Sequence, residues 1–176
     1  MTATRPGFDD RMLLVAAAVS LGGDCTRRQV GAVITDTRHR VVITGYNGSA
    51  PGGPSCLAGA CPRGRHYLIP RSERLDASTG AQCACGHSWP CNLAVEPGSS
   101  YDTGPGACHA IHAETNCLIY ADPARLPGAT LYITCEPCDG CARMIAGSGI
   151  ARTVFGPPSS GAIVEALDML DRLVSP

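Results

Sequence analysis

The sequence predicts an α/β fold of three layers, in which helices cover both faces of a mixed central sheet. Two segments rich in valine and isoleucine, 30–35 and 40–46, are separated by a short polar run, which predicts an antiparallel hairpin. In the second half, strand and helix patterns alternate, and crossovers of this kind place strands in parallel. A chain of 176 residues is long enough for one domain with its own core. We therefore expect a single domain over residues 1–176.

The elements of the first half follow from apolar spacing and turn residues. Apolar side chains recur at helical spacing from Phe8 to Val19, and Gly22-Gly23 ends that pattern. The hairpin turn falls on the polar residues 36–39. A loop rich in proline and glycine runs over residues 49–54. The first half therefore supplies one helix and two neighbouring strands.

The second half shows the same two periodicities. Pro123 ends one helical pattern, and Pro137 precedes another. Short β-branched runs lie between and after these helices. The predicted elements are a helix over 112–121, a strand over 129–134, a helix over 138–146, a strand over 152–155 and an amphipathic helix over 163–174.

Residues 56–108 differ from the rest of the chain. They have little periodicity, and they contain several of the prolines and most of the cysteines that fall outside a recognisable motif. A stretch of this length without secondary structure is uncommon inside a compact domain. We interpret it as an insertion rich in cysteine, proline and glycine, ordered by bound metal rather than by a core of its own.

The composition excludes several classes of protein. The 14 basic and 15 acidic residues nearly balance, so no strong field recruits nucleic acid or an anionic membrane. The longest apolar run, 12–19, is too short to span a bilayer and lacks the flanks of a secretory signal. The 11 cysteines are an odd number, with Cys-x-x-Cys and Cys-x-Cys spacings that favour metal ligation over disulfides. We expect a soluble, cytoplasmic metalloprotein.

Two short motifs carry the chemistry, His112-Ala113-Glu114 and, further along the chain, Pro137-Cys138-x-x-Cys141. One histidine and two cysteines can hold zinc through three protein ligands, which leaves the fourth tetrahedral position for water. Cys138 and Cys141 would lie in the first turn of a helix, where the N-terminus favours thiolate over thiol. His112 and Glu114 can converge on one ion only if their motif lies at a helix start.

Zinc bound in this way would supply hydrolytic chemistry. It lowers the pKa of a bound water to about 7, and Glu114 is placed to move protons between that water and a leaving group. Because two thiolates and a neutral imidazole leave the centre without net charge, it suits attack on an amidine-like ring carbon with loss of ammonia. Two alternatives remain: a chance coincidence of motifs, and a structural zinc completed by a fourth ligand such as Cys135.

The two motifs resemble those of the zinc-dependent nucleobase deaminases. Three further segments look like deoxycytidylate (dCMP) deaminases, namely Cys25–Val33, Thr44–Gly48 and Gly128–Tyr132. The resemblance covers most of the chain outside residues 62–107 and the C-terminus. It implies a cytidine-deaminase-like fold, a zinc cofactor, and hydrolysis of dCMP to dUMP and ammonia in pyrimidine nucleotide metabolism.

The resemblance also implies roles for individual residues. The catalytic zinc would be bound by His112, Cys138 and Cys141, and the proton shuttle would be Glu114. Asn47 would contact the sugar, and Arg27 or Arg28 would lie near the substrate phosphate. Ala113 would be a further substrate-binding residue. From residue type alone, Asn47 could instead supply a left-handed turn, and the two arginines could be solvated surface residues.

A second group of potential metal ligands lies inside the insertion. Cys83, Cys85 and Cys91 surround His87 at spacings that suit zinc. Exposed thiols on a loop are the alternative. We favour zinc, because nothing else in this segment explains how it becomes ordered.

A third group lies next to the segments that carry the resemblance. Cys25, Cys56 and Cys108, together with Cys61, can form a structural zinc site, and His109 can replace Cys108. Some phage-type dCMP deaminases hold an extra zinc near the first two of these positions. The number of structural zinc ions, one or more, is open.

The sequence departs from the family pattern in three places. The insertion around 83–91 is not part of the common pattern, and the family's fifth strand after the last helix has no counterpart before Pro176. Asn116-Cys117 replaces the more usual Asn-Ala, a change that we expect to affect packing only. Cys117 and Cys135 are predicted to be small buried side chains.

Three other functions are compatible with the motifs. The substrate could be a different small cytosine compound or a modified dCMP. A nucleic-acid editing deaminase would need a basic track, which the balanced charge does not supply. A catalytically silent zinc module is the third. We expect a nucleotide substrate, no membrane or nucleic-acid partner, and a homo-oligomer.

Overall fold

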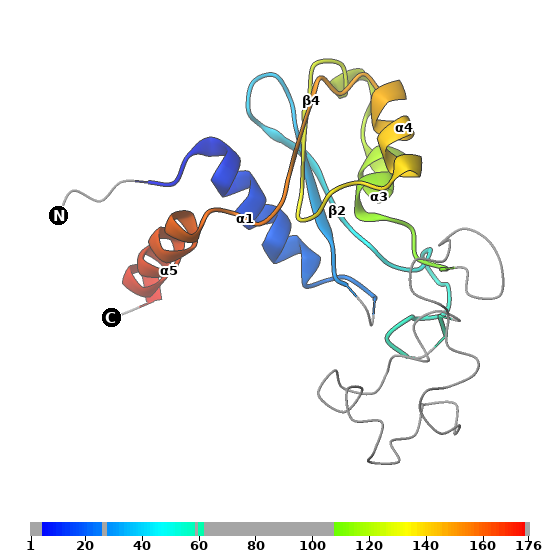
Figure 1. The fold of residues 1–176 in the computed structure, drawn as a ribbon, viewed down its shortest axis with the longest axis horizontal. Helices are drawn as coiled ribbons and strands as arrows, with labels where there is room; N and C mark the ends of the chain where they lie inside the picture. Colours follow the sequence, from blue (N-terminus) through cyan, green and yellow to red (C-terminus); the bar gives the residue numbers. More distant parts are fainter. Residues whose placement is uncertain (1–4, 26–27, 59, 62–107, 175–176) are drawn as a thin grey trace, which may run out of the picture. The chain divides into compact units, whose positions relative to one another are not determined.

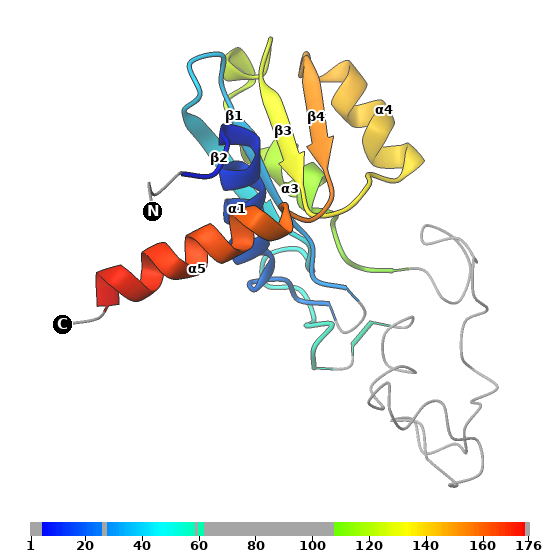
Figure 2. The ribbon, with the colours of Figure 1, turned by 60° about the vertical axis from the view of Figure 1, so that its left-hand side comes forward.

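The computed structural model describes residues 5–25, 28–58, 60–61 and 108–174. The chain divides into two compact units, of which the first comprises residues 1–23, 30–46 and 112–176 and the second residues 24–29 and 47–111. The helices and strands labelled in Figures 1 and 2 belong to the first unit. The predictions for Arg27, Cys83, Cys85, His87 and Cys91 lie outside the described residues. Among the helices that are described, none is both long and apolar enough to cross a membrane.

Within the described residues, four strands form a mixed sheet in the order β2-β1-β3-β4. Their bounds are β1 (Gly31–Thr35), β2 (Val41–Tyr46), β3 (Thr130–Ile133) and β4 (Arg152–Phe155). β1 pairs antiparallel with both β2 and β3, whereas β3 and β4 are parallel. The predicted hairpin and the predicted mixed sheet are therefore confirmed, with strand ends that differ by at most one residue from the expected ones.

The helices are α1 (Phe8–Ser20), α3 (Ala113–Tyr120), α4 (Asp139–Gly147) and α5 (Ser160–Val174), with a 3-10 turn η2 (Pro123–Arg125). α3 and α4 each begin one residue later than predicted, because His112 and Cys138 are N-caps with extended backbone, at ψ 154° and 165°. α5 begins earlier than the predicted residue 163. Its start is fixed by Ser159, whose Oγ accepts a hydrogen bond of 3.2 Å from the N–H of Ala162.

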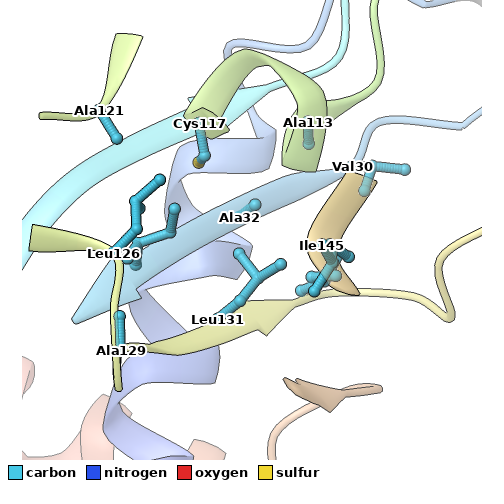
Figure 3. Close-up of a cluster of buried hydrophobic side chains, with 11 residues drawn as sticks. Val30, Ala32, Ala113, Cys117, Ala121, Leu126, Ala129, Leu131 and Ile145 are labelled. Atoms are coloured by element: carbon cyan, nitrogen blue, oxygen red, sulfur yellow. The ribbon is translucent and has the colours of Figure 1, made fainter. Parts of the chain in front are cut away.

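Alternate residues of the central strands pack against helices on opposite faces of the sheet. Ala32, Ile34 and Leu131 belong to the cluster that α3 and α4 cover, drawn in Figure 3. Val33, which lies between Ala32 and Ile34, and Tyr132, which follows Leu131, pack with α1 on the other face. Every residue of β1 is buried, as expected for a strand enclosed by helices on both sides. The three-layer α/β/α arrangement is confirmed.

Two glycines allow helices to approach the sheet closely. A Cβ at Gly31 would lie 1.9 Å from the carbonyl oxygen of Ala16, so α1 lies directly on the backbone of β1. A Cβ at Gly45 would lie 2.7 Å from the carbonyl oxygen of Ala113. β2 therefore supports the first turn of α3, the turn that carries the His-x-Glu motif.

A buried hydroxyl ties α1 to the two C-terminal strands of the sheet. The Oη of Tyr132, which is 1% exposed, donates a 2.9 Å hydrogen bond to the carboxylate of Asp9. Arg152 on β4 forms a salt bridge with the same carboxylate. The hydrogen bond from Arg152 is the largest cause that lowers the pKa of Asp9, and burial raises the pKa of Tyr132 to about 12.

Candidate metal centre

The three predicted zinc ligands lie at the starts of two helices. His112 is the N-cap of α3, and Cys138 is the N-cap of α4, with Cys141 in the first turn that follows. The extended backbone at both caps places His112 and Cys138 just outside their helices. The condition that the His-x-Glu motif must lie at a helix entry is met.

The ligand atoms of these residues converge on one point. Nδ1 of His112 lies 3.5 Å from Sγ of Cys138 and 3.3 Å from Sγ of Cys141. All three ligand atoms lie within 4.8 Å of one another. In tetrahedral zinc with ordinary Zn–S and Zn–N bonds, sulfur and nitrogen ligands are about 3.6 Å apart. The donor set and its spacing therefore fit zinc, with Nδ1 as the histidine ligand atom.

The cluster contains three protein ligands. Among the residues that the structure describes, no other histidine, cysteine, aspartate or glutamate completes this group. Cys135, the fourth ligand considered for a structural zinc, is half-buried and does not belong to it. An arrangement of three ligands is typical of catalytic zinc, in which the fourth position takes water or substrate.

The cluster is solvent-exposed on one side. Cys138 is exposed, whereas Cys141 is 3% exposed. Burial is the largest cause that raises the pKa of the Cys141 thiol, a hydrogen bond with Thr115 lowers it, and the charge of Glu114 raises it. A bound cation would oppose the effect of burial, because it stabilises the thiolate.

Glu114 lies in the first turn of α3 and is 3% exposed. Its charge also raises the pKa of Cys117, for which burial is the larger cause. Glu114 is therefore close to the sulfur of Cys141 without being a member of the ligand cluster. A buried carboxylate beside a metal site, but not bound to the metal, is suited to move protons.

The residues predicted to contact substrate are placed only in part. Asn47 is 7% exposed, and its Nδ2 donates a 2.8 Å hydrogen bond to the carbonyl of Arg28 within the second unit. His39 is the non-glycine residue with positive φ among the described positions, so the alternative of a left-handed turn at Asn47 is wrong. The side chain of Arg28 is exposed, and Ala113 is fully buried.

Cys25, Cys56, Cys61 and Cys108 all belong to the second unit, and none of them forms a disulfide. The carboxylate of Asp24 orders the loop around Cys56 by accepting hydrogen bonds from Ser55, Cys56 and Leu57. No motif or spacing in the sequence singles out Asp24.

Cys117 and Thr115 lie on α3. Cys117 is fully buried, and burial raises its pKa to about 12, which confirms that it is a small core side chain. Thr115 was not predicted to have a role, yet its Oγ1 lies 3.5 Å from Sγ of Cys141. The only signal in the sequence is its place three residues after His112, because residues at that spacing share a helix face.

The chain is similar to known deaminases over most of its length. Residues 8–157 match the family model described as the cytidine and deoxycytidylate deaminase zinc-binding region. The chain is 40% identical to the deoxycytidylate deaminase of Mycobacterium phage D29 over 152 residues, which are 86% of this chain and 96% of that protein. It is 34% identical to the deoxycytidylate deaminase of Enterobacteria phage T4 over 146 residues, 82% of this chain and 75% of that protein.

A solved structure has a similar fold. The dCMP deaminase of cyanophage S-TIM5, in complex with dCMP and dUMP, matches with a TM-score of 0.50 and 18% identity. The match covers 97% of this chain and 94% of the cyanophage chain. This similarity supports the cytidine-deaminase-like fold.

Proposed function

Because this chain belongs to the cytidine and deoxycytidylate deaminase family, we propose that it catalyses the hydrolytic deamination of dCMP to dUMP and ammonia. The observation that carries the proposal is the group of three ligand atoms from His112, Cys138 and Cys141, with the buried carboxylate of Glu114 beside it. Relatives named deoxycytidylate deaminase at 40% and 34% identity support dCMP as the substrate.

Zinc held by His112, Cys138 and Cys141 would lower the pKa of water to about 7 and so supply a nucleophile at neutral pH. Glu114 accepts a proton from the attacking water and delivers it to N3 of cytosine, while the new C4–O bond forms. A second proton then passes through Glu114 from the added hydroxyl to the exocyclic amine. The C4–N4 bond breaks, ammonia leaves, and the carbonyl of dUMP remains.

Three residues are proposed to contact the substrate. Asn47 contacts the sugar, and Arg27 contacts the phosphate. The side chain of Ala113 is packed in the core, so this residue can contact the pyrimidine only through its main chain. Asn47→Ala should raise KM for dCMP more than it lowers kcat. The contact of Asn47 with the sugar stabilises the bound substrate and the transition state alike, so its loss weakens binding without raising the barrier from the bound state.

A substrate panel tests the proposed reaction. The zinc-loaded protein is incubated with dCMP, CMP, dCTP, cytidine and cytosine, and the release of ammonia is measured. We expect the highest kcat/KM with dCMP. A higher kcat/KM with another member of the panel would contradict dCMP as the preferred substrate but would still support hydrolytic deamination. No ammonia from any of them would contradict both.

We also propose that the second unit holds a structural zinc. Cys56 and Cys61 are 1% and 4% exposed, and Cys25 and Cys108 are half-buried. Burial raises the pKa of Cys56 to about 11, and the neighbouring thiols of Cys61 and Cys108 add to that effect. The pKa of Cys108 is raised by burial first and also by Cys61 and Cys25. Buried thiols that act on one another in this way are candidates for metal ligation.

The zinc content of two variants tests this second site. The four thiols are less tightly grouped than the catalytic ligands, since the cluster within 4.8 Å among the described residues contains none of them. We expect Cys56→Ser to remove one zinc ion per chain and Cys117→Ala, a change at a buried cysteine outside the site, to remove none. Equal zinc content in wild type and Cys56→Ser would contradict the proposal.

The proposed setting is a homo-oligomer in the cytoplasm. Ile119 and Tyr120 at the end of α3 are 56% and 60% exposed, and a second copy could cover this apolar surface. A reducing compartment would keep the metal-binding thiols reduced. A monomer in sedimentation velocity at micromolar concentration would contradict the oligomer.

A further inference from the structure

The hydroxyl of Thr115 lies against one of the two sulfur ligands. Oγ1 of Thr115 is 3.5 Å from Sγ of Cys141. Thr115 belongs to the first turn of α3 and Cys141 to the first turn of α4, so the contact joins the two helices that carry the ligands. A threonine within a helix can bond back to a carbonyl of the preceding turn. Here the partner of its hydroxyl is instead the sulfur of Cys141.

Metal binding fixes the direction of this hydrogen bond. A cysteine that ligates zinc is a thiolate and has no proton to donate. The hydroxyl of Thr115 must then be the donor, and Sγ of Cys141 the acceptor. A hydrogen bond to a thiolate stabilises its negative charge, so it favours the deprotonated form that binds the metal and lowers the energy of the sulfur electrons.

The two thiolates differ in their access to water. Cys138 is exposed, so water can donate hydrogen bonds to its sulfur. Cys141 is 3% exposed and has little access to such water. Thr115 is therefore in a position to donate a hydrogen bond to the buried sulfur of Cys141, as water does to the exposed sulfur of Cys138.

We propose that Thr115 is a positioning residue of the metal centre, which holds the Cys141 sulfur in place and tunes its bond to the metal. The inference rests on the proposed function only in taking Cys141 as a zinc ligand. It assigns no contact between Thr115 and the substrate. Partners that orient ligands in this way commonly change metal affinity or activity by about 10- to 100-fold when they are removed.

Two substitutions separate the hydroxyl from the bulk of the side chain. Thr115→Val keeps the shape and removes the donor, whereas Thr115→Ser keeps the donor and removes a methyl group. Zinc affinity is measured by competition with a chelator. We expect Thr115→Val to bind zinc about tenfold more weakly than wild type and Thr115→Ser to stay close to wild type. Circular dichroism of each variant verifies that it is folded.

The cobalt-substituted protein gives a second measurement that packing alone would not change. The thiolate-to-cobalt charge-transfer band should move to longer wavelength in Thr115→Val, because the sulfur electrons lose the stabilisation of the hydrogen bond. Thr115→Ser should keep the wild-type band. An unchanged band and unchanged zinc affinity in Thr115→Val would overturn the inference, as would a Thr115→Ser variant that behaves like Thr115→Val.

These measurements need no substrate. If the protein binds zinc but does not deaminate dCMP, the proposed reaction fails while the Thr115 result still stands. If wild type and Thr115→Val are identical in both measurements and dCMP is deaminated, the inference fails and the reaction stands.

Discussion

Nδ1 of His112 lies 3.3 Å from Sγ of Cys141, although 29 residues separate them in the chain. The two residues meet because α3 and α4 pack on the same face of the sheet, and each helix begins at the cluster. The site therefore depends on the parallel pairing of β3 with β4 and on the close approach of α3 to β2. The chemistry of the site can be tested by substitutions at Glu114 and Cys141, and the packing that positions it can be tested by a substitution at Gly45.

Replacing Glu114 by glutamine should abolish proton transfer and leave the metal in place. The amide has nearly the same shape, but it cannot accept the proton of the attacking water. We expect kcat for dCMP to fall by about 10²- to 10⁴-fold, with zinc content unchanged. Glu165→Gln on α5 is the matched control and should retain wild-type activity. Full activity in Glu114→Gln would contradict the assigned role.

Removing the catalytic zinc should abolish activity reversibly. Cys141→Ser replaces a buried thiolate by a weaker ligand, so we expect loss of one zinc per chain and of ammonia release. Wild-type protein dialysed against a chelator should regain activity when zinc is added back. Activity that persists without zinc would contradict a metal-dependent reaction, and zinc analysis with a parallel assay measures both quantities.

Adding a methyl group at Gly45 should disturb the start of α3. Its Cβ would lie 2.7 Å from the carbonyl oxygen of Ala113 and 2.8 Å from Sγ of Cys117, so the helix must move. We expect Gly45→Ala to lower the free energy of unfolding by about 1–3 kcal/mol and to weaken zinc binding, since His112 precedes that turn.

A glycine in open space provides the control for this substitution. A Cβ at Gly161 in α5 would meet nothing within 4 Å. Alanine is also more favourable than glycine within a helix by about 1 kcal/mol. Gly161→Ala should therefore be neutral or stabilising in chemical denaturation. A Gly45→Ala variant as stable as wild type would mean that β2 does not set the position of α3.

The turn between β1 and β2 should stabilise the fold at neutral pH, and this contribution should be lost at acid pH. Asp36 accepts hydrogen bonds from Arg125 and from the N–H groups of Arg38 and Arg40, and Arg125 is the main cause that lowers its pKa to about 2. Because the folded pKa is below the unfolded value of 3.8, the contribution is present above pH 4 and is lost as the pH falls towards 2.

Asp36→Asn isolates this contribution. Wild type should be more stable than the variant in urea denaturation at pH 7, and the difference should shrink between pH 4 and pH 2. Asp122→Asn, at the cap of η2 and without a salt bridge to Arg125, serves as the control. A difference that stays constant over this interval would show that the carboxylate charge is not the cause.

The sequence could predict the parts of the site that depend on periodicity and spacing. The runs rich in valine and isoleucine at 30–35 and 40–46 predicted β1 and β2, and the two motifs predicted the ligands that the structure brings together. Their place at helix starts followed from Pro137 and from the need for His112 and Glu114 to converge. The roles of these residues in catalysis stay predictions until the variants are measured.

Other features depend on tertiary contacts that no local pattern encodes. The contact between Thr115 and Cys141 needs two helices brought together across 26 residues of chain and a particular side-chain rotamer. Asp24 orders residues that are more than thirty positions further along. α5 begins at Ser160, before the predicted residue 163, because Ser159 caps the helix, a role for which serine is common.

The coordination of the metal in the zinc-loaded protein tests the central claim most directly. A crystal structure with anomalous scattering data at the zinc edge identifies every ligand. We expect Nδ1 of His112 and the sulfurs of Cys138 and Cys141, with water as the fourth ligand and Glu114 unligated. A fourth protein side chain on this zinc would contradict the hydrolytic function.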